Sequence, residues 1–120
     1  EGETTEWIAQ TMLLPEVISY LNELSQTLRI TEKNSLPNSH LRTHLTEYSE
    51  LVDKFISSIE ELRKVNIDLG GETTLEKAKH MKNAVIPAMD NVRKIADKLE
   101  RLTADKKWSL PGYREMLFVK

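Results

Sequence analysis

Residues 39–69 have the sequence SHLRTHLTEYSELVDKFISSIEELRKVNIDL, which is the clearest heptad-like pattern in the chain. Its apolar side chains recur every three or four residues, which keeps them on one face of an α-helix. The apolar stripe consists of Leu41, Leu45, Tyr48, Val52, Phe55, Ile59, Leu62 and Leu69, with Asn66 as its polar member. Asn38 or Ser39 is the expected N-cap. Gly70-Gly71 is the expected end, because glycine adopts a left-handed conformation at the least cost.

Two flanking segments have the same period. Over residues 4–30, the predicted buried stripe is Trp7, Leu14, Leu21 and Leu28, with Val17, Ile18 and Leu24. Over residues 74–104, it is Ala78, Met81, Val85, Ala88, Val92, Ile95, Leu99 and Leu102. Thr73 and Glu76 have the spacing of a capping box at the start of the third segment. Pro15 and Pro87 interrupt the first and third segments and predict a kink in each.

The last stretch, residues 108–120, reads WSLPGYREMLFVK and is dense in apolar and aromatic residues, with a turn at Pro111-Gly112. So large an apolar surface is expected to be covered, and we expect this tail to pack on the helices or on a neighbour. The connections between the three segments are short, which favours antiparallel neighbours. The sequence therefore predicts a single all-α domain over residues 1–120: an antiparallel up-down-up bundle of three long helices with an aromatic C-terminal tail packed on it.

Composition excludes several classes of protein. The 17 basic and 19 acidic residues give a net charge of −2, without the basic excess that is typical of nucleic-acid-binding domains. There is no cysteine, hence no disulfide framework and no thiolate site. The longest apolar runs are too short to span a bilayer, and the opening residues EGETTEW do not resemble a signal peptide. We expect a cytoplasmic domain without nucleic-acid or membrane partners. Because the sequence lacks an initiator Met, we expect it to be a piece of a larger polypeptide.

Charge is distributed unevenly along the chain. Residues 1–70 carry six basic and twelve acidic side chains, whereas residues 71–120 carry eleven basic and seven acidic ones. The simplest interpretation is that the third segment complements the first two. A basic face that meets another subunit, or a nucleic acid, is the alternative.

Candidate sites are few. His40, His44 and Glu47 have spacings that place them on one helix face and that can hold a divalent metal. They lack the glutamate that follows the first histidine in a zincin helix. We interpret them as ordinary, partly exposed side chains, and a zinc-binding bundle would be recognised by zinc-dependent stability. His80, among lysines, is expected to be solvated. Asn66 either sets the helix register or marks where the helix frays.

No glycine-rich phosphate loop and no nucleophile elbow occur in the sequence. The carboxylates are spread along helix surfaces, without the water-poor pocket that acid–base catalysis needs. We therefore predict no catalytic, cofactor-binding or metal-binding residues in this chain.

The C-terminal third nevertheless resembles a known family. Met89, Arg93, Asp97, Leu99 and Glu100, followed by Trp108, Pro111, Tyr113, Leu117 and Phe118, are similar to the end of type III glutamine synthetases, the large form found in many bacteria, notably the Bacteroides group. The segment LLPEVISYLNEL resembles another helix of that family, with Leu14, Pro15, Tyr20, Glu23 and Leu24 at the matching positions. Ser109, Met116 and Val92 depart from the family pattern.

The resemblance implies a C-terminal helical domain of an enzyme that joins ammonia to glutamate with ATP and a divalent metal. It implies that ATP and metal are bound upstream, in the catalytic domain, so that no catalytic residue carries over to this chain. The implied partners are that catalytic domain and neighbouring subunits of a homo-oligomer. The alternative is a free-standing helical module that binds a partner through its basic third segment or its tail.

Overall fold

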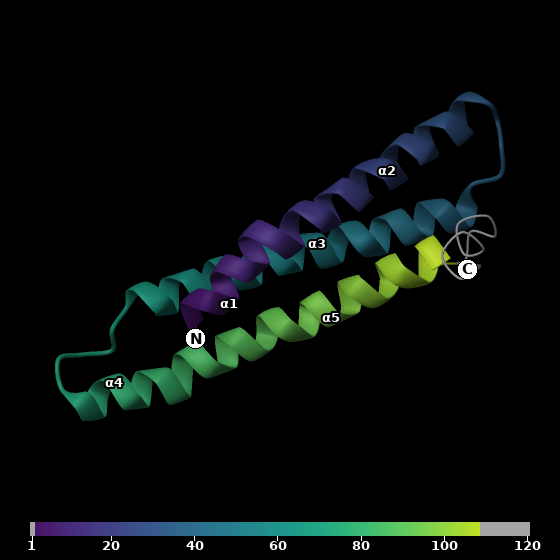
Figure 1. The fold of residues 1–120 in the computed structure, drawn as a ribbon. Helices are drawn as coiled ribbons and strands as arrows, with labels where there is room; N and C mark the ends of the chain where they lie inside the picture. The colour runs from purple at the N-terminus through teal and green to yellow at the C-terminus, as the bar shows by residue number, and fades with distance from the viewer. Residues whose placement is uncertain (1, 109–120) are drawn as a thin grey trace, which may run out of the picture.

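The computed structural model describes the backbone of residues 2–108 and the side chains of residues 2–103. Within this range the secondary structure is entirely helical: α1 (Gly2–Ile8), η1 (Ala9–Leu13), α2 (Leu14–Lys33), α3 (Ser39–Ile67), α4 (Thr74–His80), η2 (Met81–Val85) and α5 (Ile86–Trp108). The elements join end to end into three long rods, which Figure 1 shows side by side: α1–η1–α2 (the first rod), α3, and α4–η2–α5 (the third rod). The prediction of an all-helical chain with three long helical segments is confirmed.

Each of the two mid-rod prolines follows a short π-helical segment. The amide of Leu14 donates to the carbonyl of Ala9, and the amide of Ile86 donates to the carbonyl of Met81. Both bonds span five residues, so the backbone is wider in the turn directly before Pro15 and Pro87. A proline ring clashes with the carbonyl four residues earlier in a regular α-helix, and a wider turn relieves that clash. The rods thus pass through both prolines, and bends at these positions stay predictions.

The connection between the first rod and α3 is closed by a Schellman motif. The amide of Leu36 donates to the carbonyl of Thr31, and the amide of Ser35 donates to the carbonyl of Glu32. Ser35 has a φ of 54°, the left-handed conformation that this motif requires. Pro37 follows and prevents the helix from continuing. Asn38 is the N-cap of α3, and its side chain donates to the Thr31 hydroxyl rather than capping the helix.

The connection between α3 and the third rod follows the sequence prediction. Gly70 and Gly71 have φ values of 81° and 141°, conformations that L side chains rarely adopt. The predicted capping box is confirmed: the amide of Glu76 donates to the Thr73 hydroxyl, and the Glu76 carboxylate accepts from the Thr73 amide. Helix α3 ends at Ile67, and α5 continues to Trp108, four residues past the boundary that periodicity suggested.

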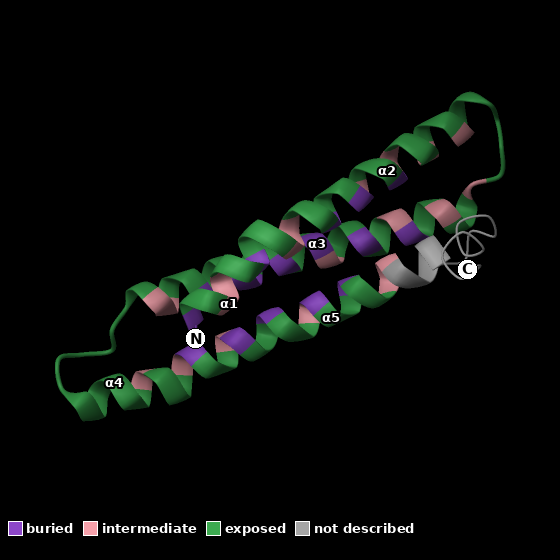
Figure 2. Cartoon of the chain, viewed as in Figure 1, coloured by how far each residue is buried: buried purple, intermediate pink, exposed green. Residues whose placement is uncertain are grey.

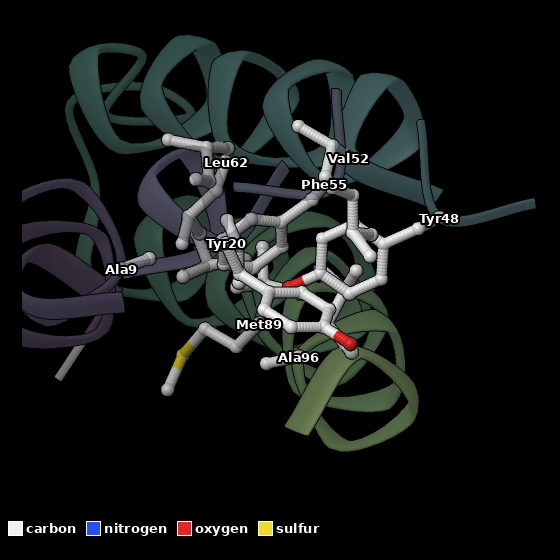
Figure 3. Packing of buried hydrophobic residues seen from close by; sticks show 14 residues of the cluster. Ala9, Tyr20, Tyr48, Val52, Phe55, Leu62, Met89 and Ala96 are labelled. Atoms are coloured by element: carbon white, nitrogen blue, oxygen red, sulfur yellow. The ribbon is translucent and has the colours of Figure 1, made fainter. Parts of the chain in front are cut away.

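The core is a seam between the three rods. Figure 2 shows the buried positions facing inward along α3 and α5, and Figure 3 shows how their side chains pack. The third rod contributes part of the predicted stripe together with Met89 and Ala96. The buried apolar residues are Ala9, Val17, Tyr20, Leu24, Tyr48, Val52, Phe55, Ile59, Leu62, Val85, Met89, Val92, Ala96 and Leu99.

The stripe predicted for the first rod is partly wrong. Trp7 is 60% exposed and Ile18 is 45% exposed, whereas Ala9 and Tyr20, which the heptad pattern omitted, are buried. Ala9, Leu13 and Val17 follow one another at intervals of four residues, whereas a heptad alternates intervals of three and four. The π-helical segment has more residues per turn than an α-helix, so these side chains stay on the inner side of the rod. At the outer ends of the predicted stripes, Leu69, Ala78 and Met81 are exposed as well.

The molecule is long and flat, with extents of 62 × 36 × 18 Å. Helix α3 packs closely against both α2 and α5, whereas α2 and α5 touch only sparsely. Figure 1 shows α2 diverging from α5 toward the 34–38 connection. A groove lies between the first and third rods. No helix within residues 2–108 combines the length and apolarity needed to cross a bilayer.

Candidate functional site

The histidines that suggested a metal site have different environments. His44 is 7% exposed and lies between tyrosine rings, whereas His40 and Glu47 are exposed. Among the described side chains, no group of three histidines or carboxylates is arranged to hold a metal ion. The interpretation of His44 as partly exposed is therefore wrong. Its spacing from Tyr48 and Val52 by steps of four, along the same seam, is the signal that indicates burial.

His44 belongs to a buried aromatic cluster with Tyr20 and Tyr48. The Tyr20 hydroxyl lies 3.3 Å from Nε2 of His44. The rings of Tyr20 and Tyr48 meet edge to face with centroids 4.9 Å apart, and those of His44 and Tyr48 are 6.0 Å apart. In Figure 3 the labelled Tyr20 and Tyr48 rings lie together, close to Ala96 of α5. The cluster fixes the first rod against α3 with both apolar and polar contacts.

Tyr48 connects this cluster to the third rod. Its hydroxyl lies 2.7 Å from the hydroxyl of Thr103, which in turn donates to the carbonyl of Leu99. Burial raises the pKa of the Tyr48 phenol, the bond to Thr103 partly offsets this, and Glu16 acts in the raising direction. Burial also raises the pKa of Tyr20 to about 12, and the nearby Tyr48 and Glu23 add to the effect. Both phenols are therefore neutral at physiological pH and act as structural hydrogen-bonding groups.

The raised pKa of Tyr20 predicts a loss of stability in alkali. An unfolded tyrosine releases its proton near pH 10.0, whereas folded Tyr20 keeps it to about pH 12. Between these values the unfolded chain binds fewer protons, so the free energy of unfolding falls as pH rises. Urea titrations at pH 8, 10 and 11.5 test this (the pH values are chosen roughly to bracket the transition).

The matched variant is Tyr20→Phe, which removes the titrating group and should flatten part of the pH profile while lowering stability at pH 8. An unchanged slope in Tyr20→Phe would show that Tyr20 does not titrate with a raised pKa.

A groove of about 410 Å³ lies between α2 and α5. Its inner wall is apolar and includes Val17 and Tyr20 of α2, Phe55 of α3 and Leu99 of α5. Its rim is polar and carries the exposed carboxylates of Glu16 and Glu100, together with Ser19 and Thr103. This volume falls within the range of roughly 300–1,000 Å³ that is typical of ligand sites. Two carboxylates on the rim favour a partner that brings apolar side chains and a positive charge.

The far end of the bundle has a second set of polar contacts. The Asn66 side chain donates to the Glu6 carboxylate at 2.9 Å, so it joins the start of the first rod to the end of α3. His80 was expected to be solvated, but it is half-buried, and its Nε2 lies 2.7 Å from the carbonyl of Val65. These contacts hold the two rod ends and the 68–73 connection together.

The residues of the family motif are distributed over core and surface. Tyr20, Met89 and Leu99 are buried, whereas Pro15, Arg93, Asp97 and Glu100 are exposed. Tyr20, Leu99 and Glu100 meet at the groove. Trp108 is the last residue of α5. Pro111, Tyr113, Leu117 and Phe118 lie outside the described residues, as does the expected packing of the tail.

The expected charge complementarity is not realised as ion pairs. Among the side chains of residues 2–103, the ion pair that forms joins Arg42 to Glu32 beside the 34–38 connection, and none joins the third rod to the other two. The basic side chains of residues 77–101 in the third rod are exposed to solvent.

The first rod carries an exposed apolar stripe, which we call the outer stripe: Trp7, Leu14 and Ile18. Trp7 and Ile18 are exposed, and each lies away from the buried line of Ala9 and Val17 on this rod. Leu14 is half-buried between them. Figure 2 shows the outward side of α1 and α2 as mostly exposed. Large side chains so placed are typical of a surface that another protein segment covers.

Comparison with known proteins gives one informative relationship. The chain is 29% identical over 122 aligned positions to a protein named type-3 glutamine synthetase from Dictyostelium discoideum. The match covers 94% of this chain but 16% of that protein, so the chain spans about one sixth of the relative's length. No family model matches the chain, and no solved structure matches it. The chain is therefore related to a part of a glutamine synthetase.

Proposed function

From this relationship to one part of a glutamine synthetase, we propose that the chain is a non-catalytic, C-terminal helical domain of a type III enzyme. The parent enzyme would join ammonia to glutamate with ATP and a divalent metal, in the cytoplasm, as a homo-oligomer. The bundle, in the antiparallel up-down-up order that its short connections favour, would brace the catalytic domain and contact neighbouring subunits. The observation that carries the proposal is the alignment, which runs over 94% of this chain but a small share of the relative.

The outer stripe supports a bracing role. The exposed apolar surface of Trp7 and Ile18 would gain free energy if another domain covered it, up to part of the roughly 1.5–3 kcal/mol that full burial of such a side chain provides. Interfaces between domains of one polypeptide cover such surfaces. We assign the outer stripe to contact with the catalytic domain.

The alternative is a free-standing helical module that binds a partner protein. The solvent-facing basic side chains of residues 77–101 favour it, because an exposed basic face suits an acidic partner. The two proposals differ in the length of the polypeptide that carries these residues.

A denaturing immunoblot of the source organism's lysate, with an antibody raised to residues 1–120, separates the two. A band several times larger than 13.8 kDa is the result that the synthetase proposal expects. A band near 13.8 kDa would overturn it and leave the interaction module.

A paired stability measurement tests the outer stripe. In residues 1–120 alone, replacing both Trp7 and Ile18 with Ser should change the free energy of unfolding little, because the side chains face solvent. In the full polypeptide the same substitutions should lower the melting temperature or the particle mass, because burial of two large side chains is lost. Gln10→Ala with Asn22→Ala, at exposed polar positions of the same rod, is the matched control. Equal behaviour of the two double variants in the full polypeptide would refute the assignment of the stripe.

A further inference from the structure

The groove between α2 and α5 has an apolar wall and an acidic rim, and the described part of the chain ends close to it. We propose that the groove is the seat of this chain's own C-terminal segment, residues 113–118, with Tyr113, Leu117 and Phe118 against the apolar wall and Arg114 at the acidic rim. This proposal is independent of the synthetase assignment, because it concerns contacts within residues 1–120.

The position of the last described residue supports this occupant. Helix α5 lines the groove with Ala96, Leu99, Glu100 and Thr103 and then continues to Trp108. At about 1.5 Å per residue, Trp108 lies roughly 12 Å along the helix axis from Glu100. To reach the groove from Trp108, the chain would have to turn back over this short distance. Pro111-Gly112 is a dipeptide that favours such a reversal.

The length of the segment also fits. Six extended residues, 113–118, span at most about 20 Å. The groove residues of the first rod run from Leu13 to Tyr20, and those of α5 from Ala96 to Thr103, each a helical span of roughly 10 Å. The segment is thus long enough to follow the groove after a turn, with residues 109–112 as the connection.

Charge and polarity suit this segment. The rim carries Glu16 and Glu100, and the exposed faces of the first rod and α3 are mainly acidic, which disfavours a second copy of those faces. Residues 109–120 contain Arg114 and Lys120 against one acid, Glu115. An apolar wall in contact with water is unfavourable, and aromatic side chains that fill it each bury roughly 150–250 Å².

Disulfide trapping in the full chain tests the proposal, since the chain has no native cysteine. Ser19→Cys, at an exposed position of the groove rim, is paired with Val119→Cys, which keeps Tyr113, Leu117 and Phe118 unchanged. Mild oxidation should give an intramolecular bond, seen as a faster-migrating monomer on a non-reducing gel. The matched control pairs Val119→Cys with Ser57→Cys, an exposed position on α3 outside the groove.

The outcomes are distinct. A fast monomer for the Ser19 pair and none for the Ser57 pair supports the proposal. Covalent dimers would overturn the proposal and assign the groove to a second copy. Equal trapping in both pairs, or none in either, would also overturn it, because the segment would then not bind in the groove. As a second measurement, cleavage by trypsin after Arg114, followed by mass spectrometry, should be about tenfold faster in Glu100→Gln than in the parent chain, and an unchanged rate would contradict contact between Arg114 and the acidic rim.

Discussion

Replacing Phe55 with Ala is expected to lower the free energy of unfolding by about 3–5 kcal/mol. Phe55 is 0% exposed, and it lies in the seam between the three rods and forms part of the groove wall. Truncation removes the transfer free energy of the ring and leaves a cavity that elongated rods cannot close by a small shift. A domain of this size has about 5–15 kcal/mol of stability, so a large share of it is lost. Urea denaturation followed by circular dichroism at about 222 nm measures the change.

The neighbouring position provides the control. Ile56 is 37% exposed, and Ile56→Ala should cost less than half as much as Phe55→Ala. If the two variants lose equal stability, Phe55 is not at the centre of the core.

Replacing Gly70 with Ala is expected to destabilise the chain by about 1–2 kcal/mol from the backbone alone. Gly70 has a φ of 81°, which an L side chain rarely adopts. A Cβ at this position would also lie against the Cβ of His80, well inside van der Waals contact. The clash should displace His80 from the carbonyl of Val65, so the total loss should exceed the backbone term. Thermal and urea unfolding measure the loss, and the NMR shift of the His80 ring reports the displacement.

Leu69→Ala is the control for Gly70→Ala, because Leu69 is exposed and precedes the glycine in the same connection. Its free energy of unfolding should stay within about 0.5 kcal/mol of the parent. A Gly70→Ala variant with the parent's stability and an unshifted His80 signal would show that the connection relaxes without strain.

Periodicity predicted α3 well because its apolar residues occur on one stripe. From Leu41 to Leu62 each member of the predicted stripe is buried or half-buried. The glycine pair and the capping box could also be predicted, because both depend on local chemistry. A positive φ favours glycine, and the side chains of Thr73 and Glu76 each accept a hydrogen bond from the other residue's amide.

The first rod was harder because its apolar residues occur on more than one side. Two sets of positions on this rod are apolar: the strict heptad from Trp7 to Leu28, and the buried set with Ala9, Val17 and Tyr20. Periodicity alone favours the heptad. The same ambiguity, between the buried face of a helix and its edge, affected the prediction of the candidate site. His44 could be assigned to the seam or to its edge, and only its contacts with Tyr20 and Tyr48 decide.

Three long helical segments, the capping box and the all-α class could be predicted from the sequence, because these depend on interactions between residues a few positions apart. The inward side of the first rod, the positions of His44 and His80, and the divergence of α2 from α5 beside a groove are known only from the packed structure. These features depend on how three rods share one seam. The free energy of that packing is a sum over contacts between residues far apart in the chain, such as Tyr48 with Thr103 and Glu6 with Asn66, and no local pattern specifies it.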